Sequence, residues 1–355
     1  MKRLVKQLVP RSDQFLAQAV VQWQANHGRH DLPWQNTRDP YRVWLSEIML
    51  QQTQVATVQA YFVRFLNRFP DVHALASATL DEVLSLWSGL GYYSRARNMH
   101  RCAQEVVRLH AGVFPSTAGQ LQDLPGIGPS TAAAITSLCF GERVAILDGN
   151  VKRVLTRYLG FDADLAQAKN EQLLWQQAST LLPAVDLAQN MPRYTQGMMD
   201  LGATLCTAKK PVCAMCPLRA RCVAFASGNP QGFPVNTRRL KRTALSLWLL
   251  WARSEDGALW LSQRPTPGVW AGLYCFAMFD SHAALQAALP DDFLASLKDL
   301  PAFKHVLTHK DLHLHPVQVL LPGGIKPDAA GEWFEAGQWP RLGMPAPVSK
   351  LLRGD

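Results

Sequence analysis

The sequence predicts two domains, a mainly α-helical domain followed by a smaller α+β domain. A length of 355 residues is enough for two domains at roughly 150 residues each. Apolar residues recur at helical spacing up to about residue 225, and short β-like runs replace them beyond it. With 48% hydrophobic and 18% charged residues, the chain can bury an ordinary core, which excludes disordered and low-complexity architectures.

Helical spacing is clear near the start, where Phe15, Ala19, Val20 and Trp23 fall on one face. The boundary is marked by turn formers over residues 227–236, and a basic cluster follows them. We therefore expect a helical domain over residues 1–230, a basic linker over 231–242 and a second domain over 243–355. In the second domain, strands are expected at 244–252, 258–263, 273–279, 305–308 and 312–321, and a helix at 282–289.

Two features bear on location and partners. The first thirteen residues are charged and have no apolar core of signal-peptide length, and the most apolar later run, near 245–252, is too short to span a bilayer. We therefore expect a cytoplasmic protein that has no membrane partner. The net charge of +9 fits either a dispersed solvated surface or an anionic partner.

Four of the seven cysteines lie together as C-x6-C-x2-C-x5-C, at Cys206, Cys213, Cys216 and Cys222. Thiolates this close together require a metal group, either zinc or a cubane iron–sulfur cluster. Zinc sites usually pair two short C-x2-C knuckles, and this loop has one, so the spacing favours the cluster over zinc. The other three, at positions 102, 139 and 275, have apolar neighbours and are expected to be core thiols.

A glycine-rich turn, Leu124-Pro-Gly-Ile-Gly128, leads into a predicted helix at Pro129. Gly126 and Gly128 allow positive φ and close approach, and proline suits the first helical position. The N–H groups of such a helix start would hold a DNA phosphate without reading sequence. Alone, this turn is more often a simple helix connector, but the cysteine loop and the positive charge favour DNA binding.

Two carboxylates have contrasting predicted environments. Glu47 lies on the apolar face of a predicted helix over 43–50, which should raise its pKa as a general acid requires; otherwise it is a surface residue at a helix edge. Asp148 stands at a helix N-cap position, where the dipole and backbone donors should keep it ionised; otherwise it merely caps the helix. One protonated and one ionised acid is the arrangement that cleaves glycosidic bonds.

The cysteine spacing and the glycine-rich turn together resemble the helix-hairpin-helix DNA glycosylases of the endonuclease III superfamily, over about residues 13–225. The resemblance implies their fold and a [4Fe–4S] cluster on the four cysteines. It also implies that Asp148 is the catalytic aspartate and that Asn150 assists at the sugar. Glu47 on the early helix, followed by Gln51-Gln52-Thr53, is similar to the pattern of the adenine-specific branch of this superfamily, the MutY family.

Further residues take their expected roles from this resemblance. Ser130 occupies the position where glycosylase-lyases carry their Schiff-base lysine, which implies a monofunctional enzyme. Lys152 is expected to contact a phosphate, to lie on a solvated face, or to trap a ring-opened product slowly. Tyr92 would insert beside the opposing base, with Gln52 and Leu90 in support.

The second domain resembles the Nudix-like domain that this family uses to recognise 8-oxoguanine. Residues 263–276 fit that pattern, but the acid-rich Nudix box is missing, so pyrophosphate hydrolysis is not expected. Where the family has Phe-Ser-His, this chain has Leu307-Thr-His309, which keeps a hydroxyl at Thr308 and the imidazole of His309 but loses the aromatic ring.

The resemblance therefore implies a monomeric, nucleoid-associated enzyme of the MutY family, which flips adenine out of duplex DNA and removes it. The expected substrates are adenine opposite 8-oxoguanine and adenine opposite guanine. Two alternatives remain, an endonuclease III-like pyrimidine glycosylase-lyase and a non-catalytic iron–sulfur protein that binds lesions. Ser130 and the second domain disfavour the first, and the paired acids disfavour the second.

Overall fold

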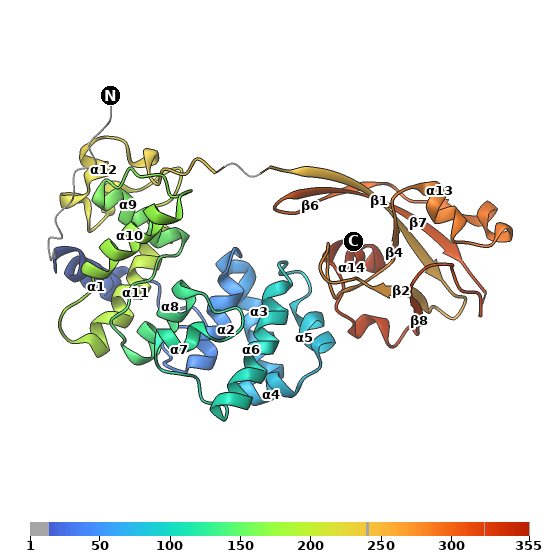
Figure 1. Cartoon of the computed structure of the whole chain (residues 1–355), viewed down its shortest axis with the longest axis horizontal. Coiled ribbons are helices and arrows are strands. Elements are labelled where there is room, and N and C mark those ends of the chain that lie inside the picture. Colours follow the sequence, from blue (N-terminus) through green and yellow to red (C-terminus); the bar gives the residue numbers. More distant parts are fainter. Residues whose placement is uncertain (1–13, 239–240, 323, 355) are drawn as a thin grey trace. The chain divides into compact units, whose positions relative to one another are not determined.

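The computed structural model describes residues 14–238, 241–322 and 324–354 (Figure 1). The charged residues 1–13, which were expected to hold no signal peptide, and the linker residues 239 and 240 lie outside the described residues. The chain divides into two compact units. Of the described residues, unit 1 comprises 14–63, 71–73 and 101–238, and unit 2 comprises 64–70, 74–100 and the remainder of the chain from 241.

Unit 1 is built from helices. Those that lie wholly in it are α1 (Gln14–His27), α2 (Pro40–Leu50), α7 (Ala118–Gln122), α8 (Pro129–Phe140), α9 (Gly149–Leu159), α10 (Ala168–Thr180), α11 (Leu187–Thr204), η1 (Cys213–Met215), η2 (Arg219–Arg221), α12 (Val223–Ala226) and η3 (Pro230–Gly232). Three helices continue from one unit into the other along the chain, namely α3 (Val55–Arg68), α4 (Val72–Ser77) and α6 (Ser94–His110).

Local chemistry sets the ends of the helices that matter for the site. Asp39 caps α2 by accepting from the N–H of Tyr41 at 2.9 Å, and Pro40 fills the first turn. Asp148 caps α9, and Gly160 ends it in the left-handed conformation at φ 64°. Pro129 begins α8, as the sequence predicts.

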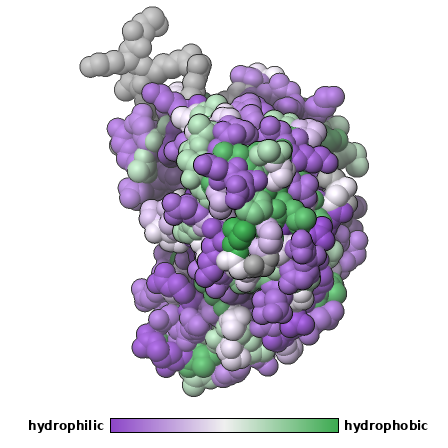
Figure 2. Space-filling model, turned by 90° about the vertical axis from the view of Figure 1, so that its right-hand side faces the viewer, coloured by the Kyte–Doolittle hydropathy of each residue, from purple (hydrophilic) through white to green (hydrophobic). Residues whose placement is uncertain are grey.

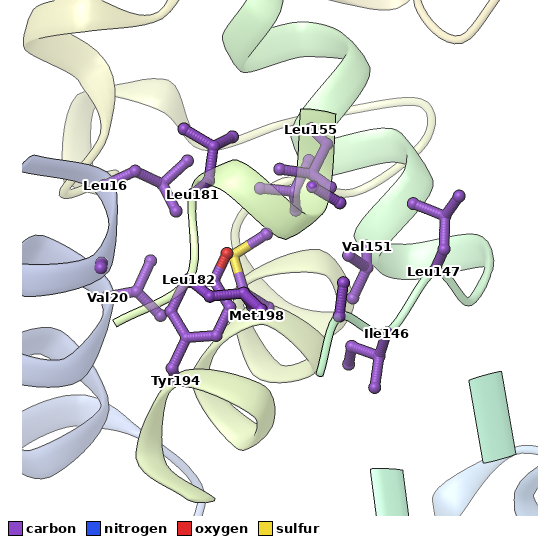
Figure 3. Close-up of a cluster of buried hydrophobic side chains, with 14 of the residues drawn as sticks. Leu16, Val20, Ile146, Leu147, Val151, Leu155, Leu181, Leu182, Tyr194 and Met198 are labelled. Carbon is purple, nitrogen blue, oxygen red and sulfur yellow. The ribbon is translucent and has the colours of Figure 1, made fainter. Parts of the chain in front are cut away.

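The core of unit 1 forms where α1, α9 and α11 meet (Figure 3). Leu16 and Val20 of α1 pack with Val151 and Leu155 of α9, and Met198 of α11 joins them. Ile146 and Leu147, which directly precede Asp148, are 3% and 2% exposed. Since the core buries Ile146 and Leu147 before Asp148 and Val151 after it, the core positions the segment that carries this carboxylate.

Unit 2 combines α5 (Leu80–Trp87) and the start of α6 with a mixed β-sheet. Its strands are β1 (Thr243–Arg253), β2 (Leu259–Gln263), β3 (Tyr274–Cys275), β4 (Ala277–Phe279), β5 (Lys298–Asp299), β6 (Phe303–Val306), β7 (Lys310–Leu320) and β8 (Glu332–Phe334). Helices α13 (His282–Ala287), η4 (Asp291–Ser296), η5 (Trp339–Arg341) and α14 (Ala346–Arg353) accompany the sheet.

The long strands β1 and β7 pair in parallel, from Thr243 opposite Lys310 to Arg253 opposite Leu320. The path through the sheet runs β3-β2-β1-β7-β5, and β4, β6 and β8 pair antiparallel with β1, β7 and β2. Ser88 and Tyr93 bind the sheet-bearing part of the unit by donating to the carbonyl of Met344, at 3.0 and 3.2 Å. These bonds explain why residues 74–100 belong to unit 2.

Most predicted strands are present, with two corrections. The single strand expected at 273–279 is two strands, because β3 pairs with β2 whereas β4 pairs with β1, so the chain changes neighbour at Phe276. The strand expected at 305–308 instead ends at Val306, because Leu307 turns back and donates to the carbonyl of Lys310 at 2.8 Å. Strands β5 and β8 and helix α14 were not expected.

Among the helices of the described residues, none has both the length and the apolar character needed to cross a membrane. Figure 2 shows that the face it draws is mainly hydrophilic, with hydrophobic residues in small separated patches.

Candidate active site

Glu47 is a half-buried carboxylate on α2, and it lines a cavity of about 490 Å³ in unit 1. Its helix neighbours Val43 and Trp44 are buried, as the apolar spacing predicts. Burial raises the pKa of Glu47 from 4.5 to about 7, and the negative charge of Asp148 adds to the shift. Glu47 can therefore carry a proton near neutral pH, which a general acid requires.

The rest of the cavity wall combines polar side chains with a few apolar ones and the large aromatic ring of Trp34. Trp34 is 7% exposed and packs edge-on against Phe62, with ring centroids 5.4 Å apart. Two amides, Gln35 and Gln196, share the wall with Glu47. Sequence reasoning did not identify these cavity residues, because they come from a turn-rich segment and from a distant helix and form no motif.

Asp148 caps α9, where its Oδ1 accepts from the N–H of Val151 at 2.7 Å. The sequence predicts that the cap holds this carboxylate ionised, but burial is the larger effect and raises its pKa. The N–H groups of Val151 and Asn150 oppose that rise, and so do the charges of Arg153 and Lys152. For Glu47, the causes of the pKa shift are burial and the charge of Asp148, and both raise the pKa. Of the two carboxyls, Glu47 is therefore the one that holds a proton.

Arg153 connects the start of α9 to the cysteine loop. Its guanidinium donates to Asn150 Oδ1 at 2.7 Å, to the carbonyl of Gly202 at 2.6 Å and to the carbonyl of Cys206 at 2.7 Å. Gly202 lies so close to Asn150 that an added Cβ would fall 2.5 Å from Asn150 Cβ. Lys152, in the same turn, pairs with Glu171 at 2.5 Å. The position of Asn150 is thus set from two sides.

At the glycine-rich turn, Gly126 adopts the positive φ that the sequence predicts, whereas Gly128 is extended at φ −86°. Gly126 has φ 78°, and Gly128 is the N-cap of α8 with no side-chain cap bond. Both glycines are exposed, which leaves the start of α8 open to an anion. Ser130 Oγ accepts from the N–H of Leu147 at 3.2 Å, so this hydroxyl also anchors the segment that leads to Asp148.

The four predicted cysteine ligands are half-buried in one loop. Arg157, 2% exposed, donates to Cys206 Sγ at 3.3 Å and to the carbonyl of Thr207 at 2.8 Å. Burial raises the pKa of Cys216 to about 11, and the charges of the other three thiols add to the shift. These thiols therefore lie close enough to interact electrostatically. By contrast, Cys102, Cys139 and Cys275 are buried, as expected of core thiols.

The four thiols form a donor set that could hold either zinc or an iron–sulfur cluster. In the part of the chain that the structure describes, no three His, Cys, Asp or Glu side chains are grouped tightly enough to hold one metal ion. A zinc ion needs four ligands that converge on one centre, whereas a cubane cluster distributes four thiolates over several iron atoms.

The predicted DNA-contact residues have different exposures. In unit 1, Gln52 is exposed and has φ 56°. In unit 2, Tyr92 is 42% exposed with φ 48°, whereas Leu90 is 5% exposed. The hydroxyls of Tyr92 and Thr308 are hydrogen-bonded at 2.6 Å, and His309 beside them is exposed.

Comparisons with known proteins show the family of the chain. Residues 45–179 match the HhH-GPD superfamily of base excision DNA repair proteins, and residues 248–354 match the NUDIX domain. Over 343 residues the chain is 36% identical to an adenine DNA glycosylase of Buchnera aphidicola subsp. Acyrthosiphon pisum, which covers 95% of this chain and 97% of that protein. The chain belongs to the adenine DNA glycosylase family.

Two further matches each cover more than half of the chain. An adenine DNA glycosylase of Mus musculus is 45% identical over 206 residues, which cover 56% of this chain and 39% of the mouse protein. A solved thermostable thymine-DNA glycosylase superposes with a TM-score of 0.53 at 26% identity, covering 61% of this chain and 97% of that one. The predicted family, helix-hairpin-helix fold and Nudix-like domain are confirmed, and the enzyme class is that of the family, a hydrolytic DNA N-glycosylase.

Proposed function

We propose that this chain hydrolyses the N-glycosidic bond of adenine mispaired with 8-oxoguanine or guanine in duplex DNA. The observation that carries the proposal is Glu47, a carboxyl with a pKa of about 7 that lines a cavity and senses the charge of Asp148. A cavity of about 490 Å³ with an aromatic wall suits a flipped purine. The chain acts as a monomer on DNA, in keeping with a nucleoid location.

In this proposal, the adenine leaves the duplex at a cost of about a few kcal/mol, which a mispair lowers. Glu47 protonates N7 of the base, so that the electrons of the breaking C1′–N9 bond move into a neutral leaving group. The carboxylate of Asp148 stabilises the sugar cation. Water then adds to C1′, either directly or after a transient ester with Asp148, and Asn150 assists at the sugar.

The proposed reaction ends at the abasic sugar. Ser130 supplies no amine for an imine, and its hydroxyl is held by the N–H of Leu147. Lys152 is the nearby amine, and its ammonium group is engaged by the carboxylate of Glu171 at 2.5 Å. We therefore expect strand breaks only after alkali treatment.

The second domain reads the base opposite the adenine in this proposal. The exposed Thr308 and His309 would contact that base, and Tyr92 would wedge beside it, with Gln52 and Leu90 in support. The hydrogen bond from Tyr92 to Thr308 supports this assignment, because it joins the proposed wedge to the proposed reading loop. The exposed start of α8, at Gly126 and Gly128, would hold a backbone phosphate.

The cysteine loop would hold a [4Fe–4S] cluster through Cys206, Cys213, Cys216 and Cys222. When bound, the cluster would cross-link the cysteine loop. Arg153 and Arg157 of α9 donate to Cys206 and so attach this loop to α9. Purified protein should be yellow-brown and absorb at the blue edge of the visible range. Cys206→Ser should lose that absorbance, and Cys139→Ser should retain it. A colourless wild-type protein that contains zinc would refute the cluster.

The deciding experiment is single-turnover cleavage of labelled duplexes that contain adenine opposite 8-oxoguanine, guanine or thymine, each with and without alkali. Alkali-dependent cleavage of the adenine strand in the first two supports a monofunctional mispair glycosylase. Glu47→Gln and Asp148→Asn should abolish it. Strand breaks without alkali would indicate lyase chemistry, and no release of adenine would refute the proposal.

A further inference from the structure

The turn that joins β6 to β7 carries Thr308 and His309, and the protein holds its backbone from two sides (Figure 1). Within the turn, Leu307 donates its N–H to the carbonyl of Lys310 at 2.8 Å. From the start of the neighbouring strand β1, Thr243 donates its N–H to the carbonyl of His309 at 3.1 Å. The backbone of the turn is therefore bonded to the sheet, while the side chains of Thr308 and His309 are exposed.

Asp311, the second residue of β7, binds two cations at the base of this turn. Its Oδ1 accepts from the guanidinium of Arg242, and its Oδ2 accepts from Lys304 Nζ at 2.7 Å. The same nitrogen of Arg242, Nη2, also donates to the carbonyl of Leu307 at 3.0 Å. Arg242 directly precedes β1, and Lys304 lies in β6. One carboxylate therefore ties the ends of three strands to the turn.

This network holds a position better than an isolated ion pair does. A single exposed pair contributes little to stability, because water screens it and two long side chains must be ordered. Here one carboxylate, 23% exposed, receives two cations, and the planar guanidinium of Arg242 fixes direction as well as charge. The bonds from Lys304 and Arg242 lower the pKa of Asp311, so the carboxylate is ionised at neutral pH.

The pairing has a second electrostatic consequence for DNA binding. A carboxylate beside a surface that binds DNA repels the phosphates unless cations neutralise it. Arg242 and Lys304 neutralise Asp311, and their pairing with it makes both less available to phosphates. Two side chains that could add non-specific affinity hold the turn instead. Because phosphate contacts carry no information about the base, this arrangement favours discrimination over affinity.

We propose that Asp311 is a positioning residue for the turn that reads the base opposite the adenine, and that it acts through Arg242 and Lys304. This inference rests on the proposed function and deepens it, because it names a residue that sets the preference for 8-oxoguanine over guanine. The two bases differ by an oxygen at C8 and a hydrogen on N7. Contacts that separate them must be held to within about 0.5 Å, and a turn with a loose backbone would contact both bases alike.

The test is Asp311→Asn, which keeps the shape of the side chain and removes its charge. Single-turnover adenine release is measured at sub-saturating enzyme from duplexes with adenine opposite 8-oxoguanine or guanine, and the ratio of the two rates should fall by about 3- to 10-fold. At saturating enzyme, the rate opposite guanine should match the wild type, because Glu47 and Asp148 lie in unit 1. Binding of a fully matched duplex should tighten, and its dependence of log K on log salt should steepen by about 1–2, because the released cations reach phosphates.

Substitutions of the cation provide an independent check. Arg242→Met should lower the ratio as Asp311→Asn does. Arg242→Lys should lower it too, because an ammonium group cannot bridge Leu307 and Asp311 as the planar guanidinium does. In the double variant Arg242→Met/Asp311→Asn, the loss should be smaller than the product of the single losses, because the two side chains act as a unit. Asp292→Asn, which removes an exposed charge from the same unit, is the matched control and should keep the wild-type ratio.

The outcomes separate this inference from the proposed function. An unchanged ratio in Asp311→Asn and Arg242→Met would overturn the positioning role and leave the glycosylase assignment in place. Weaker binding of every duplex by the same factor would also overturn it, because that is the result of general structural damage. A wild type that releases no adenine from any duplex would overturn both proposals. A lower ratio in Asp311→Asn together with tighter binding of matched DNA would support the positioning role.

Discussion

Replacing Glu47 by glutamine should stabilise the protein at alkaline pH while removing its proposed acid. The folded-state pKa of Glu47 is about 7, raised from 4.5 first by burial and then by the charge of Asp148. A carboxyl whose folded pKa is raised binds its proton more tightly in the folded state, so stability falls as pH rises from about 4.5 to 7. That difference corresponds to ~3 kcal/mol of unfolding free energy above pH 7.

The measurement is urea unfolding of wild type and Glu47→Gln at pH 4.5 and pH 8, followed by tryptophan fluorescence. The variant should lie within ~0.5 kcal/mol of the wild type at pH 4.5, where Glu47 is protonated in the folded chain and half protonated in the unfolded chain. At pH 8 it should be more stable by up to ~3 kcal/mol. Asp162→Asn removes the same charge from the exposed surface of unit 1 and should show little gain. Equal stability of wild type and Glu47→Gln at pH 8 would refute the assignment of a raised pKa.

Three other predictions concern activity and binding. Single-turnover adenine release should fall about tenfold per pH unit above about 7, because Glu47 loses the proton it must donate; a rate that is flat to pH 9 would contradict this. Gly202→Ala should slow adenine release by ~10²-fold, because the new Cβ would fall 2.5 Å from Asn150 Cβ and displace the start of α9. The control is Gly119→Ala, whose new Cβ would have no atom within 4 Å. Tyr92→Ala should weaken binding to a mispaired duplex by ~1–3 kcal/mol and to matched DNA by less, measured by titration with labelled duplexes; equal losses would argue against a wedge.

Local rules in the sequence determine much of the site. The N-cap at Asp148, the proline start of α8 and the apolar face around Glu47 depend on neighbours within one or two helical turns. The loop with four cysteines needs no tertiary information either, because ligand spacing is a property of the chain. The direction of the pKa shift of Glu47 is also predictable, because its apolar neighbours lie on the same helix.

Only the tertiary structure decides which distant side chains share the cavity and in what orientation. Gln35 and Gln196 are separated by most of unit 1, and no pattern joins them. The orientation of the Gln196 amide depends on Asp200, and that of the Gln35 amide depends on the backbone N–H of Leu32. Both contacts exist only in the folded conformation. The pKa of Asp148 shows the same limit. The backbone N–H groups that lower this pKa belong to the local helix start, but the burial that raises it is the larger effect and comes from packing by remote helices.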